Sequence, residues 1–434
     1  LPVADALRFC IRIIPFSIAL PFSATSDQFA LWRIIVILLA GRVFIQSKAR
    51  TVFATTPAPL LVAFVSLLVL ATTSLATALW PWIGLKRIIY LVNAALLGLS
   101  AYALLQQKMT TKEVLFKDIA IGALGAMAVG YVQLLSTYLM DIYQFMRLWG
   151  EHIQLRQFGS QWSTIAVWVG NTWFAYFGDQ LSLRLFSVFP DSHSFPTYLV
   201  LALPALVMVA STFATRARRV VFFCVTMLAI ILSGTRGIWL AGILTLVSSV
   251  LVVLVARKRA PQVSTAYRKA SFVLLALIPM FLVAFPIFAS PQFLLSKGDT
   301  DFLRNRIRSI IDLGETSNGT RILIWKASLA SIADNPLLGV GIGNFPSVLG
   351  QSIILARAGS TAHNLYLHVP AEMGIPAGII AFGTLVLIGL RAFWWSVRAG
   401  KEEGTIAALT ALSLLWMYIY VGTDPIIFDE RILL

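Results

Sequence analysis

Three short polar stretches interrupt the long apolar runs of this sequence, and each carries a side chain that could bind an anion or move a proton. Residues 233–237 place Arg236 in a tight turn between two apolar runs, and a second stretch begins at Arg321. The third begins at His363 and leads directly into another apolar run. Arginine grips phosphate oxygens with two parallel hydrogen bonds, and histidine titrates near neutral pH. The three stretches predict an anion site with a base, although each arginine alone could simply anchor a helix end at lipid phosphates.

The Arg321 stretch is predicted to form one amphipathic helix over 319–336, because its apolar residues recur at helical spacing and Pro336 ends the run. The glycine-rich residues 337–345 that follow could bring backbone N–H groups and Asn344 close to a phosphate. No phosphate-binding lysine accompanies these glycines, so this part of the pattern is weak.

Residues 190–194 are a further candidate, since Asp191 and His193 lie where another apolar run begins. The alternative for Asp191 is a helix N-cap and nothing more.

The sequence offers little for a metal ion. His363 and His368 are five residues apart and do not share a helix face, which argues against joint ligation. Asp299 and Asp301 resemble the D-x-D metal pair of nucleotide-sugar glycosyltransferases, but a polar loop produces this pattern easily. We therefore expect neither a metal nor another cofactor.

These stretches must be positioned by membrane helices, because the 434 residues are 58% hydrophobic and only 12% charged. Mean hydropathy is +0.83, and soluble domains carry about 25% charged residues. The net charge of +15 suggests cytoplasmic loops and lipid headgroups before nucleic acid, for which no compact basic domain exists. The two cysteines, Cys10 and Cys224, lie in apolar runs. The chain begins without Met and stops in an apolar tail, so we expect further residues, and a final membrane span among them, beyond its ends.

The fold class we predict is an all-α polytopic membrane protein with about 11 to 12 transmembrane helices. Placing the N-terminus inside puts the Lys- and Arg-rich loops on one side, which the positive-inside rule makes cytoplasmic. Two long segments then lie outside and hold arginines that include Arg147, Arg156 and Arg184. The spans are expected near 7–24, 30–46, 59–79, 88–105, 118–138, 194–213, 220–235, 237–256, 270–288, 374–395 and 404–421.

Five regions follow from this span pattern. They are N-terminal transmembrane helices over 1–138, an extracytoplasmic segment over 139–193, central helices over 194–288, a large extracytoplasmic catalytic loop over 289–365 and C-terminal helices over 366–434.

Three motifs in this order resemble the O-antigen ligase and O-antigen polymerase superfamily of bacterial membrane glycosyltransferases. They are the turn 233–237, the pattern R-x-x-x-W … N-P-L-L-G-V-G-x-G-N-F from Arg321 to Phe345, and H-N-x-Y-L … E-x-G-x-x-x-G from His363 to Gly378. The resemblance covers roughly 190–390. A Pro-Asn pair of the family is Pro190-Asp191 here, which leaves the role of Asp191 open.

The resemblance implies a membrane glycosyltransferase of the GT-C-like kind. It would move a glycan from undecaprenyl diphosphate to an acceptor hydroxyl, on a lipid core or another glycan, at the outer face of the bacterial inner membrane. Inversion without a metal or nucleotide is expected. The residues implied as catalytic are His363 as base and Arg236 and Arg321 as phosphate ligands, and we predict substrate contacts from Asp191, His193, Asn344, Asn364 and Tyr366.

Other functions stay open at this point. A polymerase that joins repeat units would share every motif. A solute transporter fits the composition, but no internal repeat is visible and the spans lack acidic residues for ion coupling. An assembly scaffold explains none of the placed arginines and histidines.

Overall fold

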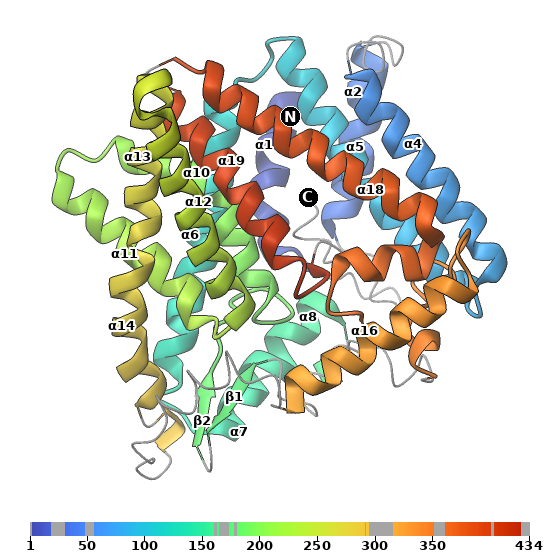
Figure 1. Ribbon diagram of the computed structural model, residues 1–434. Coiled ribbons are helices and arrows are strands. Elements are labelled where there is room, and N and C mark those ends of the chain that lie inside the picture. The colour runs from blue at the N-terminus through green and yellow to red at the C-terminus, as the bar shows by residue number, and fades with distance from the viewer. Residues whose placement is uncertain are drawn as a thin grey trace.

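The computed structural model describes residues 2–18, 31–47, 56–159, 163–164, 173–177, 180–290, 292–294, 316–350, 361–400 and 403–426. Within these residues the chain is a bundle of helices with one short β-hairpin (Figure 1). The longer helices are α1 (Val3–Ile13), α2 (Leu31–Ser47), α4 (Ala58–Thr73), α5 (Pro81–Gln106), α6 (Lys112–Ser136), α10 (Ser194–Ser211), α11 (Arg216–Leu232), α12 (Arg236–Arg259), α13 (Pro261–Leu275), α14 (Leu277–Ala289), α16 (Thr316–Asp334), α18 (Leu365–Arg398) and α19 (Gly404–Tyr420).

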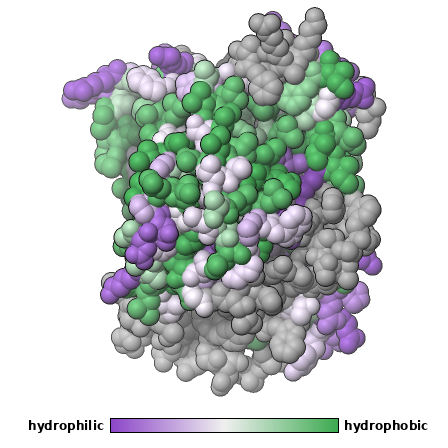
Figure 2. Space-filling model, turned by 90° about the vertical axis from the view of Figure 1, so that its right-hand side faces the viewer, coloured by the Kyte–Doolittle hydropathy of each residue, from purple (hydrophilic) through white to green (hydrophobic). Residues whose placement is uncertain are grey.

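Seven helical segments among the described residues are long and apolar enough to cross a membrane. They are α4 with the 3₁₀ turn η2 (Ser74–Thr77), α5, α6, α10, α12, α13 continued by α14, and α18. The other predicted spans correspond to shorter helices, namely α1 with 11 residues and α2, α11 and α19 with 17 residues each. Hydrophobic side chains cover a broad area of the face shown in Figure 2. The prediction of an all-α polytopic membrane protein is confirmed. Among the elements that it did not include are the hairpin and the short helices Ile142–Phe145, Met146–Gln154 and Leu155–Phe158 of the segment 139–193.

Local sequence signals explain where several helices begin. The Thr111 hydroxyl accepts a hydrogen bond from the N–H of Val114 at 3.4 Å and so caps α6. Thr215 caps α11 in the same way, and Pro81 and Pro261 occupy the first positions of α5 and α13. A hydroxyl at the N-cap and a proline at the first position both suit the unpaired N–H groups there.

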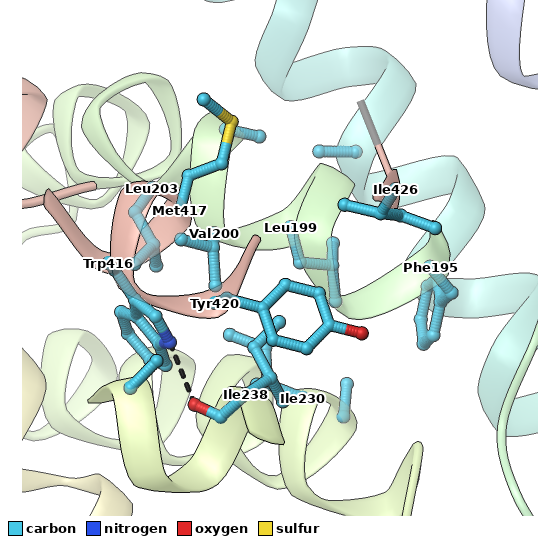
Figure 3. Close-up of a cluster of buried hydrophobic side chains, with 14 of the residues drawn as sticks. Phe195, Leu199, Val200, Leu203, Ile230, Ile238, Trp416, Met417, Tyr420 and Ile426 are labelled. Carbon is cyan, nitrogen blue, oxygen red and sulfur yellow. Dashed lines mark hydrogen bonds between the residues drawn. The ribbon is translucent and has the colours of Figure 1, made fainter. Parts of the chain in front are cut away.

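The most buried helix is α10, which packs against α6, α11 and α19. In the same core, the indole N–H of Trp416 on α19 donates to the carbonyl of Ile238 on α12 at 2.8 Å (Figure 3). Gly242 makes this approach possible, because a Cβ there would lie 2.6 Å from the Trp416 ring. The start of α12 is thereby held against α19, and both helices lead to the candidate site.

The N-terminal helices join the bundle through a buried ion cluster. Asp118 on α6 is fully buried and accepts from Nε of Arg8 at 3.0 Å and from Nε of Arg12 at 2.6 Å. A buried carboxylate is stable only when paired, so these contacts fix α1 against α6.

A β-hairpin lies at the end of the bundle where the α11–α12 turn is found (Figure 1). Strands β1 (Phe174–Phe177) and β2 (Gln180–Leu183) are antiparallel, with Phe174 opposite Leu183. The N–H of Leu185 donates to the Leu232 carbonyl at the end of α11 at 3.0 Å. This bond attaches the hairpin to the bundle and fixes the intervening Arg184.

Helix α16 lies at the same end of the bundle and packs against α18 (Figure 1). Gly374 interrupts α18 with φ +82°, and a Cβ there would overlap the Leu337 carbonyl. The N–H of Ile375, freed by this kink, donates to the Pro336 carbonyl at 2.7 Å. Only glycine permits this conformation and this close approach, so the kink joins the end of α16 to α18.

Candidate active site

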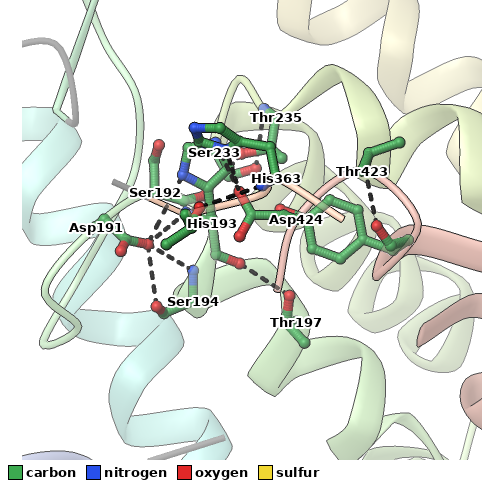
Figure 4. A network of polar contacts seen from close by, with 12 residues as sticks. Asp191, Ser192, His193, Ser194, Thr197, Ser233, Thr235, His363, Thr423 and Asp424 are labelled. Atoms are coloured by element: carbon green, nitrogen blue, oxygen red, sulfur yellow. Dashed lines mark hydrogen bonds and ion pairs between the residues drawn. The ribbon is translucent and has the colours of Figure 1, made fainter. Parts of the chain in front are cut away.

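Asp191 orders the turn that precedes α10. Its Oδ1 accepts hydrogen bonds from the N–H of His193 at 2.8 Å, the N–H of Ser194 at 2.8 Å and the Ser194 hydroxyl at 3.0 Å (Figure 4). Three donors on one oxygen satisfy free N–H groups at the helix start. Asp191 therefore orders the turn before α10, whose N-cap residue is His193, and fixes the position of His193.

Arg184 links the hairpin, the α10 turn and the α11–α12 turn. Its Nε donates to the Ser233 carbonyl at 3.4 Å, and one terminal nitrogen lies 3.3 Å from the Thr235 hydroxyl and 3.4 Å from Nε2 of His193. The Thr235 hydroxyl in turn donates to the Ser192 carbonyl at 2.8 Å. Gly234 has φ +66° and passes close to the Arg184 side chain, where a Cβ would lie 2.9 Å from Cγ.

Arg236 is the first residue of α12 and lies beside this network. Its charge is close enough to that of Arg184 to lower the Arg184 pKa. The next residue, Gly237, packs against the turn after α19, because a Cβ there would overlap the Thr423 hydroxyl. The turn that contains Arg236 therefore packs against the turn that contains Thr423 and Asp424.

Asp424 lies at the centre of the site. Its Oδ2 is 3.9 Å from Nε2 of His193 and 3.8 Å from Nδ1 of His363 (Figure 4). The carboxylate is only 13% exposed, and the two histidines come from segments 170 residues apart in the chain (363 − 193). One carboxylate oxygen thus faces two imidazoles.

His363 has a left-handed backbone, with φ +46°. Its N–H lies 3.3 Å from the Thr361 hydroxyl, and the carbonyl before it, that of Ala362, accepts from the Trp325 indole at 2.9 Å. Its Nδ1 is buried and has no hydrogen-bond partner among the described residues, and Oδ2 of Asp424 lies 3.8 Å from it. Non-glycine residues in this region cost free energy and often lie at functional sites, so the strained turn marks His363.

Arg321 reaches the site from α16. It precedes Trp325 by four residues, so both lie on one helix face, and Trp325 is bonded to the Ala362 carbonyl. The Arg321 guanidinium is near enough to Asp424 to contribute to a lower Asp424 pKa. The predicted amphipathic helix thus carries Arg321 to the same place as His363.

The charges of the site perturb one another. Burial alone would raise the pKa of Asp424, but His193, His363 and Arg321 outweigh it and leave the pKa below its ordinary value. Desolvation lowers the pKa of His193, Arg184 lowers it further, and Asp424 opposes the change. Desolvation also lowers the pKa of Arg184 to about 10, which keeps it charged at neutral pH. The site at pH 7 therefore contains a charged carboxylate, a neutral His193 and surrounding guanidinium groups.

Asn344 and the glycine-rich stretch make structural contacts between helices, and the predicted substrate contact of Asn344 stays a prediction. Asn344 is fully buried, and its Oδ1 accepts from the N–H of Trp80 at 2.8 Å. The N–H of Gly341 donates to the Glu372 carbonyl at 2.8 Å, and that of Ile342 to the Ser74 hydroxyl at 3.1 Å. Backbone donors used in this way cannot also hold a phosphate, so the glycines serve close packing between helices.

Asn364 and Tyr366 make structural contacts at the start of α18, and their predicted substrate contacts stay predictions. The Asn364 Oδ1 caps α18 by accepting from the N–H of Tyr366 at 2.9 Å. The Tyr366 hydroxyl donates to the Tyr418 carbonyl on α19 at 2.8 Å, and its ring packs against Phe382. Both side chains hold the start of α18 in place and so position His363.

His368 is buried next to the site without entering it. Its ring stacks on Phe345 at 4.7 Å, and Nδ1 accepts from the N–H of Ala362 at 3.3 Å. The opposite nitrogen lies 3.5 Å from Oε1 of Glu372. His368 therefore supports the turn of His363. The two histidines have different partners, as expected for residues five apart that do not share a helix face.

Sequence reasoning missed the central role of Asp424 and the linking role of Arg184. Arg184 was recognised only as one arginine of an outer segment, and Asp424 lies in a short turn that ends an apolar helix. A usable signal existed, because the span pattern places the end of the last helix on the same side as His363. An acidic residue at that end of an otherwise apolar helix was a candidate partner for a histidine.

Among the described residues, no group of three or more His, Cys, Asp and Glu side chains is arranged to hold a metal ion. Asp299 and Asp301, the only sequence pattern that resembled a metal site, lie outside the described residues.

The fold and the site together define a multi-pass helical membrane protein with a cationic, histidine-bearing centre at one end of its bundle. Residues 220–382 match the model of a family described as O-antigen ligase. Through this segment the chain is similar to that family, which supports the resemblance to the O-antigen ligase and O-antigen polymerase superfamily that its motifs predicted. The matched segment contains Arg236, Arg321 and His363, whereas Arg184, Asp191, His193 and Asp424 lie outside it. No curated protein matches the chain.

Proposed function

We propose that this protein is an O-antigen ligase-type glycosyltransferase that moves a glycan from undecaprenyl diphosphate to an acceptor hydroxyl on a lipid core or another glycan. The observation that carries the proposal is the meeting of His363 and His193 at one oxygen of Asp424, 3.8 and 3.9 Å away, among the arginines 184, 236 and 321. Cations for a diphosphate and a base for a hydroxyl are the two needs of this reaction.

The arginines answer the first need. The leaving group of this reaction is the lipid diphosphate, which departs as a stable anion. Neutralising the charge on its phosphate oxygens therefore helps more than a proton donor does. Arg236 and Arg321 approach from different helices and can hold the diphosphate between them. Arg184 is bonded to the Ser233 carbonyl and the Thr235 hydroxyl, so it adds positive charge and positions Arg236.

His363 and Asp424 answer the second need. With Nδ1–H directed at Asp424, the opposite nitrogen of His363 is left as an acceptor for the proton of the acceptor hydroxyl. The hydroxyl oxygen forms the new bond to the anomeric carbon while the bond from that carbon to the diphosphate breaks. The proton passes to His363, and Asp424 stabilises the imidazolium that results. Attack opposite the leaving group inverts the anomeric centre.

The second histidine has a supporting role in this scheme. His193 is held by the Asp191 turn, lies 3.4 Å from Arg184 and shares Asp424 with His363. We propose that His193 and Asp191 keep the Asp424 carboxylate and the arginines in place, and that His193 also contacts the donor.

The location follows from the reaction and the charge pattern. We propose that the site faces the extracytoplasmic side of the bacterial inner membrane, because the Lys- and Arg-rich loops lie at the opposite ends of the helices. The described helices α7 (Ile142–Phe145) and α16 would then lie outside the membrane on that side.

Two experiments test the proposal. Purified protein with a lipid-linked glycan and a lipid-core acceptor should form product in excess EDTA, and activity lost to EDTA and restored by Mg²⁺ or Mn²⁺ would refute the metal-free scheme. Deletion of the gene should leave long lipid-linked chains, as expected for a ligase. Accumulation of single repeat units would instead show the alternative, a polymerase, and normal glycans with altered solute uptake would indicate a transporter.

A further inference from the structure

A second polar site lies at the far end of α18. A cavity of about 410 Å³ is lined by Arg391, Trp394, Trp395 and Arg398. Helix α18 begins two residues after His363, kinks at Gly374 and ends at Arg398, and the 24 residues after the kink correspond to roughly 36 Å at about 1.5 Å per residue. The cavity and the candidate active site are therefore at opposite ends of a membrane-crossing helix.

The lining residues occupy one helix face. Their spacing of three, four and seven residues from Arg391 places all four side chains together. The opposite face is packed, because Ala392 and Ser396 are buried and the Ser396 hydroxyl lies 3.0 Å from the hydroxyl of Tyr267 on α13. The last turn of α18 is thus fixed by its inner face and presents its arginines outward.

The cavity is rich in positive charge and aromatic surface. The Arg398 guanidinium lies 5.4 Å from the Trp394 ring centre, and the Lys112 ammonium lies 5.6 Å from that of Trp395. Lys112 has a partner, Glu403, at 3.2 Å. In the described part of the chain neither Arg391 nor Arg398 forms an ion pair, so the cavity retains a net positive charge.

An exposed apolar stripe leads along α18 to this cavity. Ile379 is 67% exposed, Val386 58% and Leu390 51%, and Trp394 continues the stripe with 53% exposure. On a helix that crosses the bilayer, such a stripe faces acyl chains, and tryptophan marks the level of the headgroups. A molecule with a negative head and apolar tails matches the whole surface.

We propose that this cavity binds the phosphate of an anionic glycerophospholipid, with its acyl chains along α18, in the leaflet opposite the active site. Arginine pairs with phosphate through two parallel hydrogen bonds, and basic pockets at helix ends on the cytoplasmic side are suited to anionic headgroups. A second copy of the chain is a poor occupant, because a two-fold interface would bring the same arginines against each other.

Native mass spectrometry of the full-length protein tests this site. The protein is exchanged into mixed micelles with dioleoyl phosphatidylglycerol or with dioleoyl phosphatidylcholine, and retained lipids are counted over a titration. We expect one phosphatidylglycerol to be retained at concentrations at which phosphatidylcholine is not. Replacing Arg391 and Arg398 together by Gln should weaken this binding by at least about tenfold, since a hydrogen bond to a charged group contributes about 1.5–3 kcal/mol.

The matched control replaces Arg257 and Arg259 by Gln. These arginines are exposed in the last turn of α12, at the same end of the bundle, and no tryptophan accompanies them there. Equal loss of phosphatidylglycerol in both double variants would show a general effect of basic charge and overturn the proposal. Undiminished retention in the Arg391 and Arg398 variant would overturn it as well.

Two further arms separate other occupants. Displacement of the lipid by millimolar inorganic phosphate would show that a free anion, and not a lipid, is the ligand, and a dimer that only the Arg391 and Arg398 variant loses would indicate a protein contact. Trp394→Phe keeps the charge and the packing, so its lipid affinity should fall severalfold while its melting temperature stays unchanged. Wild-type affinity in Trp394→Phe would contradict the aromatic part of the site.

Discussion

Replacing Asp424 by Asn tests the proposed base most directly. The substitution keeps the size of the side chain and removes the charge that faces His363 at 3.8 Å. In the proposed reaction the imidazole is neutral before attack and positive in the transition state, so the carboxylate stabilises mainly the transition state. Asp424→Asn should therefore lower kcat and leave the KM for the donor nearly unchanged.

The separation gives the size of the effect. Two unit charges 3.8 Å apart interact by about 4 kcal/mol at an effective dielectric constant of about 20. The His363 side chain is 33% exposed, so solvent screening reduces this value to about 3 kcal/mol. At about 1.36 kcal/mol per decade, Asp424→Asn should slow turnover about 10²-fold.

The assay measures single-turnover glycan transfer with saturating lipid-linked donor and purified full-length enzyme. Asp334→Asn is the matched control, because Asp334 is an exposed carboxylate at the end of α16. A loss of less than about threefold in Asp424→Asn, with an unchanged melting temperature, would refute the pairing of His363 with Asp424. An equal loss in Asp334→Asn would show a general effect of surface charge.

Four further predictions follow from the same geometry. His363→Ala should lower turnover by about 10² to 10⁴, the usual range for general-base assistance, whereas exposed His152→Ala should retain activity; wild-type turnover in the His363 variant would exclude it as the base. Arg321→Lys should weaken use of the lipid diphosphate donor, because a point charge cannot replace a two-pronged grip, and full donor affinity would make Arg321 an interfacial anchor. His368→Ala should lower the free energy of unfolding by about 2–4 kcal/mol through a lost ring contact and an unpaired N–H, a loss visible as a lower melting temperature. Desolvation and Arg184 lower the pKa of His193 in the folded state, so the unfolded chain binds a proton at this histidine first as the pH falls below about 6.5. The melting temperature should therefore fall on acidification more steeply in the wild type than in His193→Gln. Parallel plots of melting temperature against pH would contradict the lowered pKa.

The sequence allowed the helices to be predicted and Arg236, Arg321 and His363 to be selected as candidates, because both inferences rest on local patterns. Apolar runs of sufficient length define spans, and the motifs around Arg236, Arg321 and His363 each occupy a few consecutive residues. The amphipathic pattern before Pro336 gave α16 almost to its ends.

Roles that depend on contacts between distant segments were not predictable in the same way. The role of Asp424 depends on the position of the end of α19, which lies beside His193 and His363. The same holds for Asn344, whose partner Trp80 is 264 residues away. A polar residue in a motif can hold helices together or bind a substrate, and spacing alone does not distinguish the two.

The glycine kink in α18 also determines how the residues of the site are joined to one another. Besides the bond from Ile375 to Pro336, the N–H of Val340 donates to the Ala371 carbonyl at 3.0 Å, and Trp325 is tied to Ala362. Helix α16 and the first turns of α18 are therefore coupled as one rigid body that carries both Arg321 and His363. These three hydrogen bonds fix the separation between Arg321 and His363, whereas Arg236 belongs to α12 and its distance from both is set by the packing of α12 against α19.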